Sequence, residues 1–289
     1  MFKNILLPIY NNRRAERAIP YALEFAERAG AHLTFITIVD KNTSTDEENK
    51  AIDYIKNVSE ETYKLADGKV NVCWELGRGE LEKTIARYVE KKAIDLVCLA
   101  SSTQKGLITT ITGNHTERIT RAVHCPALVV SNDEIKEYGY IFSHILMPLD
   151  GSEDSTNAQV IGAKLAKTFK LSITLFTMVQ PVSIAGGADL VGLSGVTNNM
   201  INKENFKEAR QHLEEVAASM TEQGIDATFK TVMGTNSADE IAKAFKEYKA
   251  DLTVMVTRDY SPMEAFFMAS TSRKIVSMDC LPVLMIRQQ

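Results

Sequence analysis

The chain has 289 residues, of which 45% are hydrophobic and 24% are charged, and its formal net charge is −4 at pH 7. These are ordinary values for a globular protein, and the length is enough for two hydrophobic cores of the usual domain size. The acidic balance argues against a generally basic surface for nucleic acid or anionic lipid, so we expect no nucleic-acid partner.

The first half of the chain alternates between predicted strands and predicted helices. Residues 3–9 form an almost continuously apolar run, which predicts a strand covered on both faces. Apolar residues at helical spacing follow over residues 13–29, and Gly30 ends that predicted helix. The remaining predicted elements are a strand at 32–39, a helix at 46–66, a strand at 70–76, a helix at 80–92, a strand at 95–100, a helix at 114–123 and a strand at 127–130.

The second half repeats the first. Pro8 and Pro148 are separated by 148 − 8 = 140 positions, whereas Asp95 and Asp251 are separated by 251 − 95 = 156. The register therefore changes by 156 − 140 = 16 residues, an insertion that we place before the third strand of the second copy. A repeat of this length indicates two homologous domains rather than a solenoid, whose repeats are far shorter.

The repeat predicts the domain organisation and the place of the sites. We expect two tandem α/β domains, each a doubly wound five-stranded parallel sheet, at residues 1–133 and 143–289, with a linker at 134–142. Ligands bind such sheets beyond the carboxyl ends of the strands, at the switch point. The candidate turns are residues 10–14 and 101–114 in the first copy, and 150–154 and 257–272 in the second.

The cysteines and the apolar segments indicate the setting of the protein. The four cysteines show no Cys-x-x-Cys spacing, which favours reduced thiols and a cytoplasmic location. The N-terminal residues lead directly into the first strand and lack the pattern of a signal peptide. The longest nearly uncharged segment, residues 171–201, is interrupted by Pro181 and several glycines, so we expect no membrane span.

The motifs of both halves resemble those of the universal stress protein family, in its tandem two-domain form. The pieces are Ile-Leu-Leu-Pro at 5–8 and Ile-Leu-Met-Pro-Leu-Asp-Gly-Ser at 145–152, the fourth strands that open with Asp-Leu at 95 and 251, and the closing strands after Pro126 and Pro282. The resemblance covers essentially all of both halves. It implies a Rossmann-like fold and a non-catalytic stress-response protein that binds a small ligand, with ATP or another adenine nucleotide as the candidate cofactor.

Nucleotide-binding members of this family carry an Asp after the first strand, near the adenine. They also carry a loop Gly-x-x-Gly that is followed, after nine residues, by Gly-Ser or Gly-Thr, which cradles the ribose and phosphates. Glycine lets backbone N–H groups approach the phosphates, and the following helix N-terminus favours negative charge. In the first copy, the Asp, the three glycine positions and the hydroxyl position fall on Tyr10, Ala100, Thr103, Gly113 and Asn114.

The second copy keeps the Asp, as Asp150, but none of the glycines. The glycine positions fall on Val256, Asp259 and Ala269, with Ser270 at the hydroxyl position. A carboxylate about 5 Å from a phosphate charge would be repelled by roughly 3 kcal/mol at an effective dielectric near 20. Losing the aspartate hydrogen bond at Tyr10 would cost the first copy about 1.5–3 kcal/mol. We therefore expect the second copy to be the poorer phosphate site.

The two expected sites contain no identifiable catalytic machinery. The spacing shows no nucleophile–base pair, no carboxylate dyad and no metal-ligand pattern, so we expect neither catalytic residues nor metal ligands. The sequence leaves open a nucleotide hydrolase or transferase of the same superfamily, and a structural adaptor with closed pockets. The residues expected to line the sites are Ile9, Tyr10, Val39, Ala100, Ser101, Thr103, Gly113, Asn114 and His115 in the first copy, and Leu149, Asp150, Val179, Val256, Thr257, Asp259, Ser270 and Thr271 in the second.

Two further expectations concern assembly and the insertion. The last strands, residues 127–130 and 283–286, are too apolar for an exposed sheet edge, so we expect them to meet as an intramolecular pseudo-dimer, with further homo-oligomerisation left open.

The insertion at 180–201 is apolar and rich in glycine, which indicates an irregular loop. We expect this loop to form a lid over the second site, for an uncharged ligand. The sequence leaves open with equal weight a disordered loop or one that packs on another chain.

Overall fold

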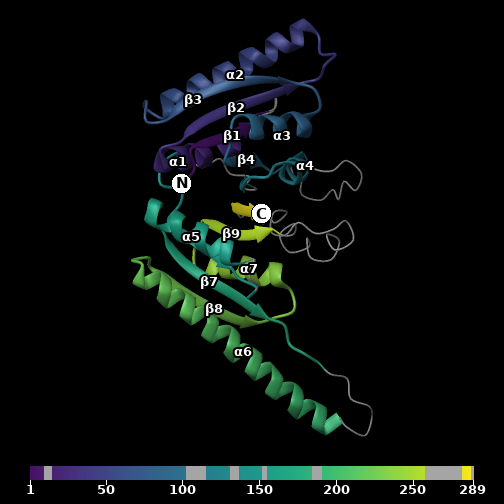
Figure 1. The fold of residues 1–289 in the computed structure, drawn as a ribbon, viewed down its shortest axis with the longest axis vertical. Helices are drawn as coiled ribbons and strands as arrows, with labels where there is room; N and C mark the ends of the chain where they lie inside the picture. Colours follow the sequence, from purple (N-terminus) through teal and green to yellow (C-terminus); the bar gives the residue numbers. More distant parts are fainter. Residues whose placement is uncertain are drawn as a thin grey trace. The chain divides into compact units, whose positions relative to one another are not determined.

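The computed structural model describes residues 1–9, 15–101, 115–130, 137–151, 155–183, 191–257 and 282–287. The chain forms two compact units, which are described separately below (Figure 1). Unit 1 comprises Met1–Phe142 and the residues from Val256 onward, and unit 2 comprises Ser143–Met255. The C-terminal strand therefore groups with unit 1, although the repeat in the sequence assigns it to the second copy. The domain boundaries drawn from the repeat stay a prediction.

Unit 1 confirms the predicted alternation of strands and helices. Its described elements are β1 (Asn4–Pro8), the 3₁₀ turn η1 (Ala15–Ala18), α1 (Ile19–Ala29), β2 (His32–Val39), α2 (Thr45–Leu65), β3 (Asn71–Arg78), α3 (Leu81–Lys91), β4 (Leu96–Ala100), α4 (His115–Ala122), β5 (Ala127–Val130) and β10 (Val283–Arg287). The strand order is β3-β2-β1-β4-β5-β10. The first five strands are parallel, as predicted, whereas β10 pairs with β5 in the antiparallel sense.

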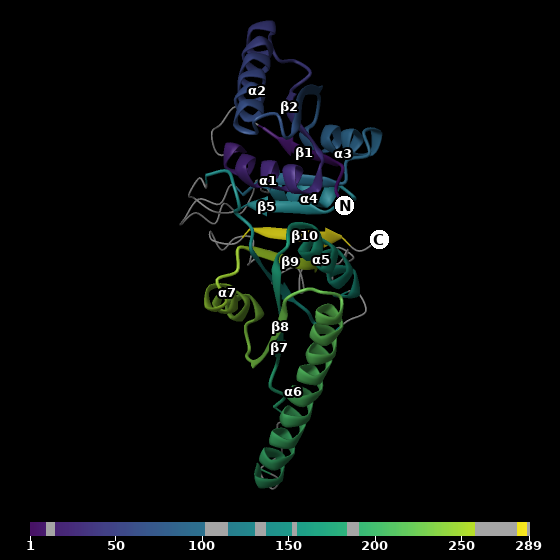
Figure 2. The same cartoon turned by 90° about the vertical axis from the view of Figure 1, so that its left-hand side faces the viewer.

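Helices cover both faces of the sheet of unit 1. Apolar residues of α3 and α4, among them Ile85 and Ile119, pack on strand residues that include Leu6 and Val97. Helices α1 and α2 lie on the opposite side of the strands (Figure 2). This two-sided cover explains why the strands read as nearly continuous apolar runs in the sequence.

The first helix begins later than its periodicity predicts. The apolar pattern predicts a helix from residue 13, but residues 15–18 form the 3₁₀ turn η1 and α1 begins at Ile19. Residues 13 and 14 lie outside the described part. Pro20 occupies the first turn of α1. A proline ring clashes with the carbonyl four residues earlier in an α-helix. The regular helix is therefore favoured only from Ile19, the residue before Pro20.

Unit 2 repeats the same arrangement with a longer helix. Its elements are β6 (His144–Pro148), α5 (Ser155–Phe169), β7 (Ser172–Val179), α6 (Val191–Glu222), β8 (Ala227–Met233), α7 (Ser237–Glu247) and β9 (Leu252–Thr257), whose last two residues group with unit 1. The strand order is β9-β6-β7-β8, and the neighbouring strands are parallel. Helix α7 lies on one side of these strands, and α5 and α6 lie on the other (Figure 2).

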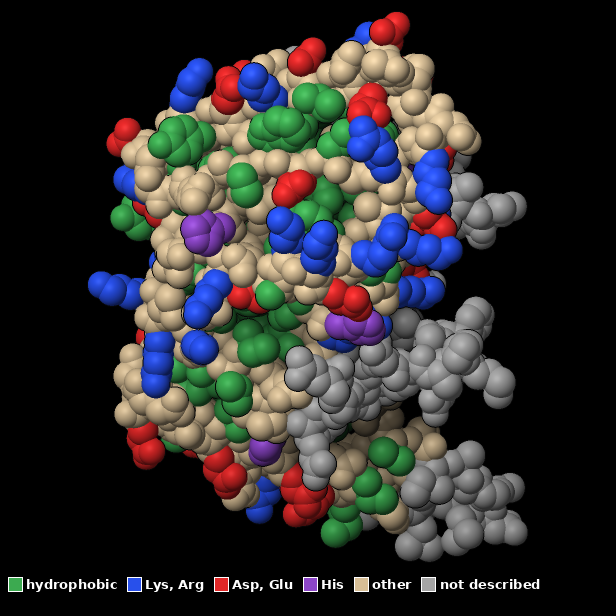
Figure 3. Space-filling view, turned by 45° about the horizontal axis from the view of Figure 1, so that its top comes forward, with side chains coloured by type: hydrophobic (Ala, Val, Ile, Leu, Met, Phe, Trp, Pro, Cys, Tyr) green, Lys and Arg blue, Asp and Glu red, His purple; other side chains and the backbone are tan. Residues whose placement is uncertain are grey.

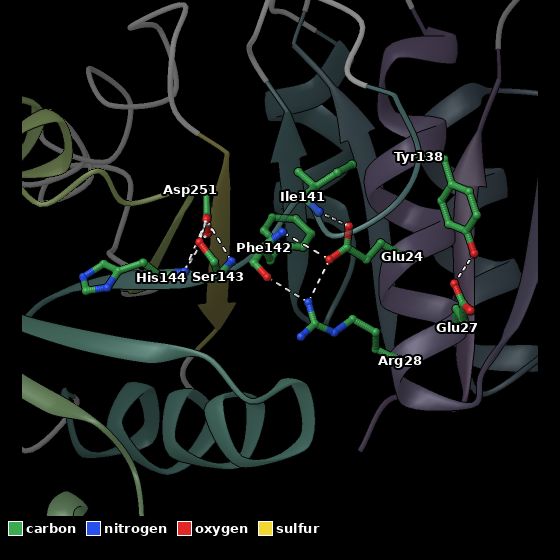
Figure 4. Close-up of polar contacts among 9 residues, drawn as sticks. All are labelled: Glu24, Glu27, Arg28, Tyr138, Ile141, Phe142, Ser143, His144 and Asp251. Carbon is green, nitrogen blue, oxygen red and sulfur yellow. Dashed lines mark hydrogen bonds and ion pairs between the residues drawn. The ribbon is translucent and has the colours of Figure 1, made fainter.

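The aspartate that opens the fourth strand has the same structural role in both units. The Asp95 carboxylate accepts hydrogen bonds from the backbone N–H groups of Lys3, at 2.7 Å, and Asn4, at 3.0 Å. In unit 2, Asp251 accepts from Ser143, at 2.8 Å, and His144, at 3.1 Å (Figure 4). Each carboxylate binds two N–H groups at the start of the first strand of its copy. The repeated Asp-Leu motif therefore lies at the amino edge of the sheet, away from the expected ligand sites.

The segment predicted as a linker is attached to α1 of unit 1. The Glu24 carboxylate, 2% exposed, accepts hydrogen bonds from the backbone N–H groups of Ile141 and Phe142. Arg28 forms an ion pair with Glu24 at 2.8 Å and donates to the Phe142 carbonyl oxygen at 2.8 Å (Figure 4). The Phe142 ring contacts the Phe25 ring edge-on, with 5.1 Å between the ring centroids. Ile141 and Phe142, at the end of the segment, are thus part of the core of unit 1.

The strand pairing locates the insertion. Leu33 pairs with Val72 in unit 1 and Ile173 pairs with Ala227 in unit 2, so the third strands correspond with a shift of 227 − 72 = 155. The second strands correspond with a shift of 173 − 33 = 140. Thus, by this register, 155 − 140 = 15 of the 16 extra residues lie between the second and third strands.

Helix α6 contains much of the insertion. Thr45, the first residue of α2, corresponds to position 45 + 155 = 200, whereas α6 already begins at Val191, which is 200 − 191 = 9 residues earlier. The predicted irregular lid over residues 180–201 is therefore wrong for residues 191–201, which are helical. Residues 184–190 lie outside the described part.

A side chain of α6 also binds the segment that follows β7. The Asn202 side chain accepts a hydrogen bond from the Val182 N–H at 2.7 Å and donates one to the Val182 carbonyl oxygen at 3.2 Å. Each glycine in the early turns costs about 1 kcal/mol relative to alanine, but extending an existing helix adds a hydrogen bond per residue without a new nucleation step. The continuation from the packed part of α6 explains why the glycine-rich stretch is helical.

Candidate functional site

The carboxyl edge of unit 1 is built from the ends of β1, β2 and β4, which are neighbours in the sheet. Ile9 follows β1, is fully buried, and donates its backbone N–H to the Ile36 carbonyl oxygen at 2.8 Å. Val39 ends β2 and is also buried, and its carbonyl oxygen accepts the Gly79 N–H at 2.9 Å. Two of the expected site residues therefore place buried apolar side chains at this edge.

Hydrogen bonds link the end of β4 to α4. The Thr116 hydroxyl donates to the Ala100 carbonyl oxygen at 3.0 Å, and the Ser101 N–H donates to the Val130 carbonyl oxygen at 2.7 Å. Thr116 and Ser101 are both buried. The two residues that flank positions 102–114, Ser101 and His115, therefore belong to segments that are fixed to the same strand end.

A buried carboxylate joins α3 to α4. Arg118 approaches Glu82 with both ends of its guanidinium group: Nε lies 2.9 Å from Oε1, and Nη2 donates to Oε2 at 3.0 Å. His115 Nδ1 lies 3.8 Å from the same Oε1, with the His115 side chain 63% exposed. Only 9% of the Glu82 side chain is exposed, so its charge is met mainly by Arg118. The contact fixes α4 on α3 and leaves the imidazole of His115 open to solvent.

The equivalent edge of unit 2 repeats these backbone bonds. Leu149 is buried and donates its N–H to the Phe176 carbonyl oxygen at 2.8 Å, as Ile9 does to Ile36. The Val179 carbonyl oxygen accepts the Gly234 N–H at 3.1 Å, the counterpart of the bond at Val39. Asp150 follows Leu149 and is exposed. Val256 and Thr257 are the last two residues of β9.

The expected site residues fall partly inside and partly outside the described part of the chain. The structure brings together Ile9, Val39, Ala100 and Ser101 in unit 1, and Leu149 and Val179 in unit 2. The expected residues that lie outside the described part of the chain are Tyr10, Thr103, Gly113, Asn114, Asp259, Ser270 and Thr271.

A pocket that the sequence reasoning missed lies beyond the ends of β2 and β3. Its volume is about 540 Å³, and basic and acidic side chains line it together. The signals in the sequence were the two glycines after the third strand and the two basic residues one helical turn apart in α3. The lining residues are Asp40, Lys41, Asn42, Gly79, Glu80, Lys83 and Arg87.

Two glycines, one near the end of β3 and one just after it, lie beside this pocket. A Cβ atom at Gly77 would lie 2.5 Å from Ile38 Cδ1 and 2.8 Å from Thr84 Cγ2, so no larger residue fits without movement. Gly79 has a φ of 120°, a conformation that side chains disfavour. The glycines thus allow α3 to start close against the end of β2.

On the face drawn in Figure 3, Lys and Arg side chains are mixed with Asp and Glu. Within the described ranges, no group of three or more His, Cys, Asp or Glu residues is placed to hold a metal ion. No helix in the described part is long and apolar enough to cross a membrane.

Comparisons with known proteins agree with the repeat and the fold. The model of the universal stress protein family matches residues 1–131 and 142–287. A universal stress protein of Staphylococcus haemolyticus is 29% identical over 146 residues, which are 47% of this chain and 88% of the relative. The stress response protein NhaX of Bacillus subtilis is 26% identical over 161 residues, which are 50% of this chain and 96% of the relative.

Solved structures show the same fold over the whole chain. A universal stress protein of Archaeoglobus fulgidus aligns with a TM-score of 0.75 at 14% identity, covering 99% of this chain and 96% of the other. One from Pseudomonas aeruginosa aligns with a TM-score of 0.60 at 15% identity, covering 99% and 93%. Identities this low show a shared fold and carry no information about ligands.

Proposed function

Because the chain belongs to the universal stress protein family, with two tandem copies of the domain, we propose that it is a non-catalytic stress-response protein that binds a small ligand. The observation that carries this proposal is the assembled carboxyl edge of unit 1, where Ile9, Val39 and Ser101 are buried at neighbouring strand ends. A site held in place before the ligand arrives loses less conformational freedom on binding.

An adenine nucleotide bound by the first copy is the ligand we propose. The first copy retains Gly113 of the family loop, and the Thr116 bond to Ala100 fixes the start of α4 at the end of β4. The second copy has Asp259 in its loop, which would repel phosphate. We therefore propose that the two copies differ, and that the second takes no triphosphate.

Calorimetric titration of the full chain with ATP and magnesium tests this proposal. Gly113→Val should weaken binding by at least about tenfold, because a branched side chain blocks the approach of backbone N–H groups to the phosphates. Ala269→Val, the matched change at 113 + 156 = 269 in the second copy, should leave the affinity unchanged. Absence of binding, or weakening by Ala269→Val alone, would contradict the proposal.

The same samples distinguish binding from turnover. Phosphate released from ATP should stay at the level of a protein-free control. Release that depends on the protein and is abolished by Gly113→Val would instead favour the nucleotide hydrolase. Binding that is absent in the wild-type chain and in both variants would favour the structural adaptor.

We further propose that β10 replaces a second subunit at the edge of β5. Leu284 pairs with Leu128, and the repeat shift relates these two residues, because 284 − 128 = 156. Val283 pairs with Val129 and Met285 pairs with Ala127 on either side. The strand pairing is therefore self-complementary about one residue pair, as in an isologous contact between identical strands.

A further inference from the structure

The pocket beyond β2 and β3 is distinct from the nucleotide site proposed above. It is lined by the residues that follow β2, by Gly79 and Glu80 after β3, and by the first two turns of α3. Its described lining residues come from three separate stretches of sequence, and none of them is among the residues expected to line the nucleotide site. Its volume of about 540 Å³ is ample for a small organic molecule.

The carboxylates of the pocket are already engaged. Glu80 Oε2 lies 2.7 Å from the Lys83 ammonium group in an ion pair between neighbouring turns. Asp40 Oδ1 accepts the backbone N–H of Asn42 at 3.0 Å, which directs that carboxylate into its own turn. Both acids therefore have partners within the rim of the pocket.

Two of the basic side chains have no such acidic partner. Within the described ranges, no carboxylate forms an ion pair with Lys41 or Arg87. Arg87 Nε donates to the Lys83 carbonyl oxygen at 3.2 Å, and Nη2 contacts the Thr84 hydroxyl at 3.5 Å. A guanidinium group has five N–H donors, so Arg87 retains donors for a ligand.

The basic character belongs to the first copy alone. Lys41 corresponds to position 41 + 140 = 181, which is Pro181, and Lys83 corresponds to 83 + 156 = 239, which is Asp239. Arg87 corresponds to 87 + 156 = 243, which is Lys243. The second copy thus loses two of the three cations and gains an acid, so the positive charge is not a requirement of the fold.

We propose that the first copy binds, in this pocket, a small organic ligand through an oxyanion group, a phosphate or a carboxylate. Ammonium and guanidinium groups bind such oxygens with charge-assisted hydrogen bonds, and Arg matches them in a bidentate geometry. Lys41 and Arg87 supply the charge, while Lys83 adds a donor shared with Glu80. The room beyond the anionic group takes the organic part of the ligand.

Amide NMR of the full chain tests the proposal with inorganic phosphate and, separately, acetate, at constant ionic strength against chloride. The amides of Lys41, Asn42 and Gly79 should shift and saturate with at least one of the two anions. Lys41→Gln and Arg87→Gln should each raise the dissociation constant about tenfold, the loss of roughly 1.4 kcal/mol per charge contact. The anion that binds more tightly identifies the group.

Matched variants complete the test. Lys83→Asp, which copies the residue of the second unit, should abolish the saturable shifts, whereas Lys243→Gln should leave them unchanged. Gly113→Val should also leave them unchanged, so this site and the nucleotide site can fail independently. Shifts that never saturate in the unchanged chain, or that saturate with an unchanged dissociation constant in Lys41→Gln and Arg87→Gln, would overturn the proposal.

Discussion

Arg118 is the residue that neutralises the buried carboxylate of Glu82, and no equivalent pair exists in the second copy, where position 82 + 156 = 238 is Ala238. The Glu82 side chain is 9% exposed and that of Arg118 is 49% exposed. Solvent therefore screens the pair mainly at the Arg118 guanidinium group and little at the Glu82 carboxylate. A charge left without a partner in such a place costs more than the pair itself contributes.

Arg118→Met should therefore lower the free energy of unfolding by about 1–3 kcal/mol, measured by urea denaturation. Adding Glu82→Gln to this variant should restore part of the loss, because the uncompensated charge is removed. The control is Arg121→Met, which breaks an exposed pair with Glu117 and should cost less than about 0.5 kcal/mol. Equal losses in the two single variants would contradict this account.

His144 in unit 2 makes stability depend on pH. Its Nδ1 lies 2.6 Å from the Ser172 hydroxyl and its Nε2 lies 2.8 Å from the Thr174 hydroxyl. Burial lowers the pKa of His144 below its ordinary value of 6.5, and the carboxylates of Asp251 and Asp226 offset part of that shift. The unfolded chain therefore takes up a proton at this residue before the folded chain does.

Stability should consequently fall as the pH is lowered through 6.5, the ordinary pKa of histidine, toward the lower pKa of folded His144. In His144→Gln, the free energy of unfolding should fall less over the same range, because Gln keeps hydrogen-bonding groups and does not titrate. The measurement is urea denaturation at a series of pH values. Identical pH slopes for the two proteins would show that another group is responsible.

At the scale of elements, Asn202 attaches α6 to the segment that follows β7. The Asn202 side chain bonds both the N–H and the carbonyl oxygen of Val182, three residues after the end of β7. Asn202→Ala should speed hydrogen exchange at the Val182 amide by about tenfold, since one hydrogen bond contributes roughly 1 kcal/mol or more. Asn202→Asp, which keeps only the acceptor, should show a smaller effect. Unchanged exchange in Asn202→Ala would refute this role.

Most elements can be predicted from the sequence because their buried apolar residues recur at the spacing of a helix or a strand. Helix α2 lies within one residue of its expected bounds, and Ser44 and Glu47 form the capping box that begins it. The start of α6 has no such spacing of apolar residues. Its glycines resemble a loop, and their helical state depends on the packed turns that follow and on Asn202, neither of which apolar spacing reveals.

The candidate site divides in the same way. Ile9 and Val39 could be expected at the edge because they end apolar strands. The oxyanion pocket could not, since Lys41 lies far in sequence from Gly79 and Arg87 and meets them only when β2 and β3 are paired. Charged residues at a strand end are common on any surface, so their pattern alone does not indicate a pocket.

For the whole molecule, β10 determines whether the apolar edge of β5 is open. Leu128, Val129, Val283 and Leu284 are all fully buried, and β5 and β10 are the equivalent last strands of the two copies. Without β10, β5 would present unpaired N–H and carbonyl groups beside apolar side chains.

Deletion of residues 282–289 should therefore raise the mass of the particle in solution above that of the full chain of 32.1 kDa at the same concentration, by light scattering. The reason is that β5 of one chain can pair with β5 of another. Deletion of residues 288–289 alone, which leaves β10 intact, is the control and should change nothing. A truncated chain that stays folded at the mass of the full-length form would contradict this role of β10.

The antiparallel pairing of β5 with β10 also has a genetic consequence. When two identical strands pair about a twofold axis, one codon change alters both strands. A larger residue is therefore introduced at two places in the pairing at once. In this chain the two sides are encoded separately, and they have diverged: Met285 lies opposite Ala127, whereas Val283 lies opposite Val129. Two identical strands in this register would instead place alanine against valine on both sides, the residues of β5 at 127 and 129. Because the two strands are encoded separately, one side of the pairing has methionine opposite alanine and the other has valine opposite valine, a difference that two identical strands cannot show.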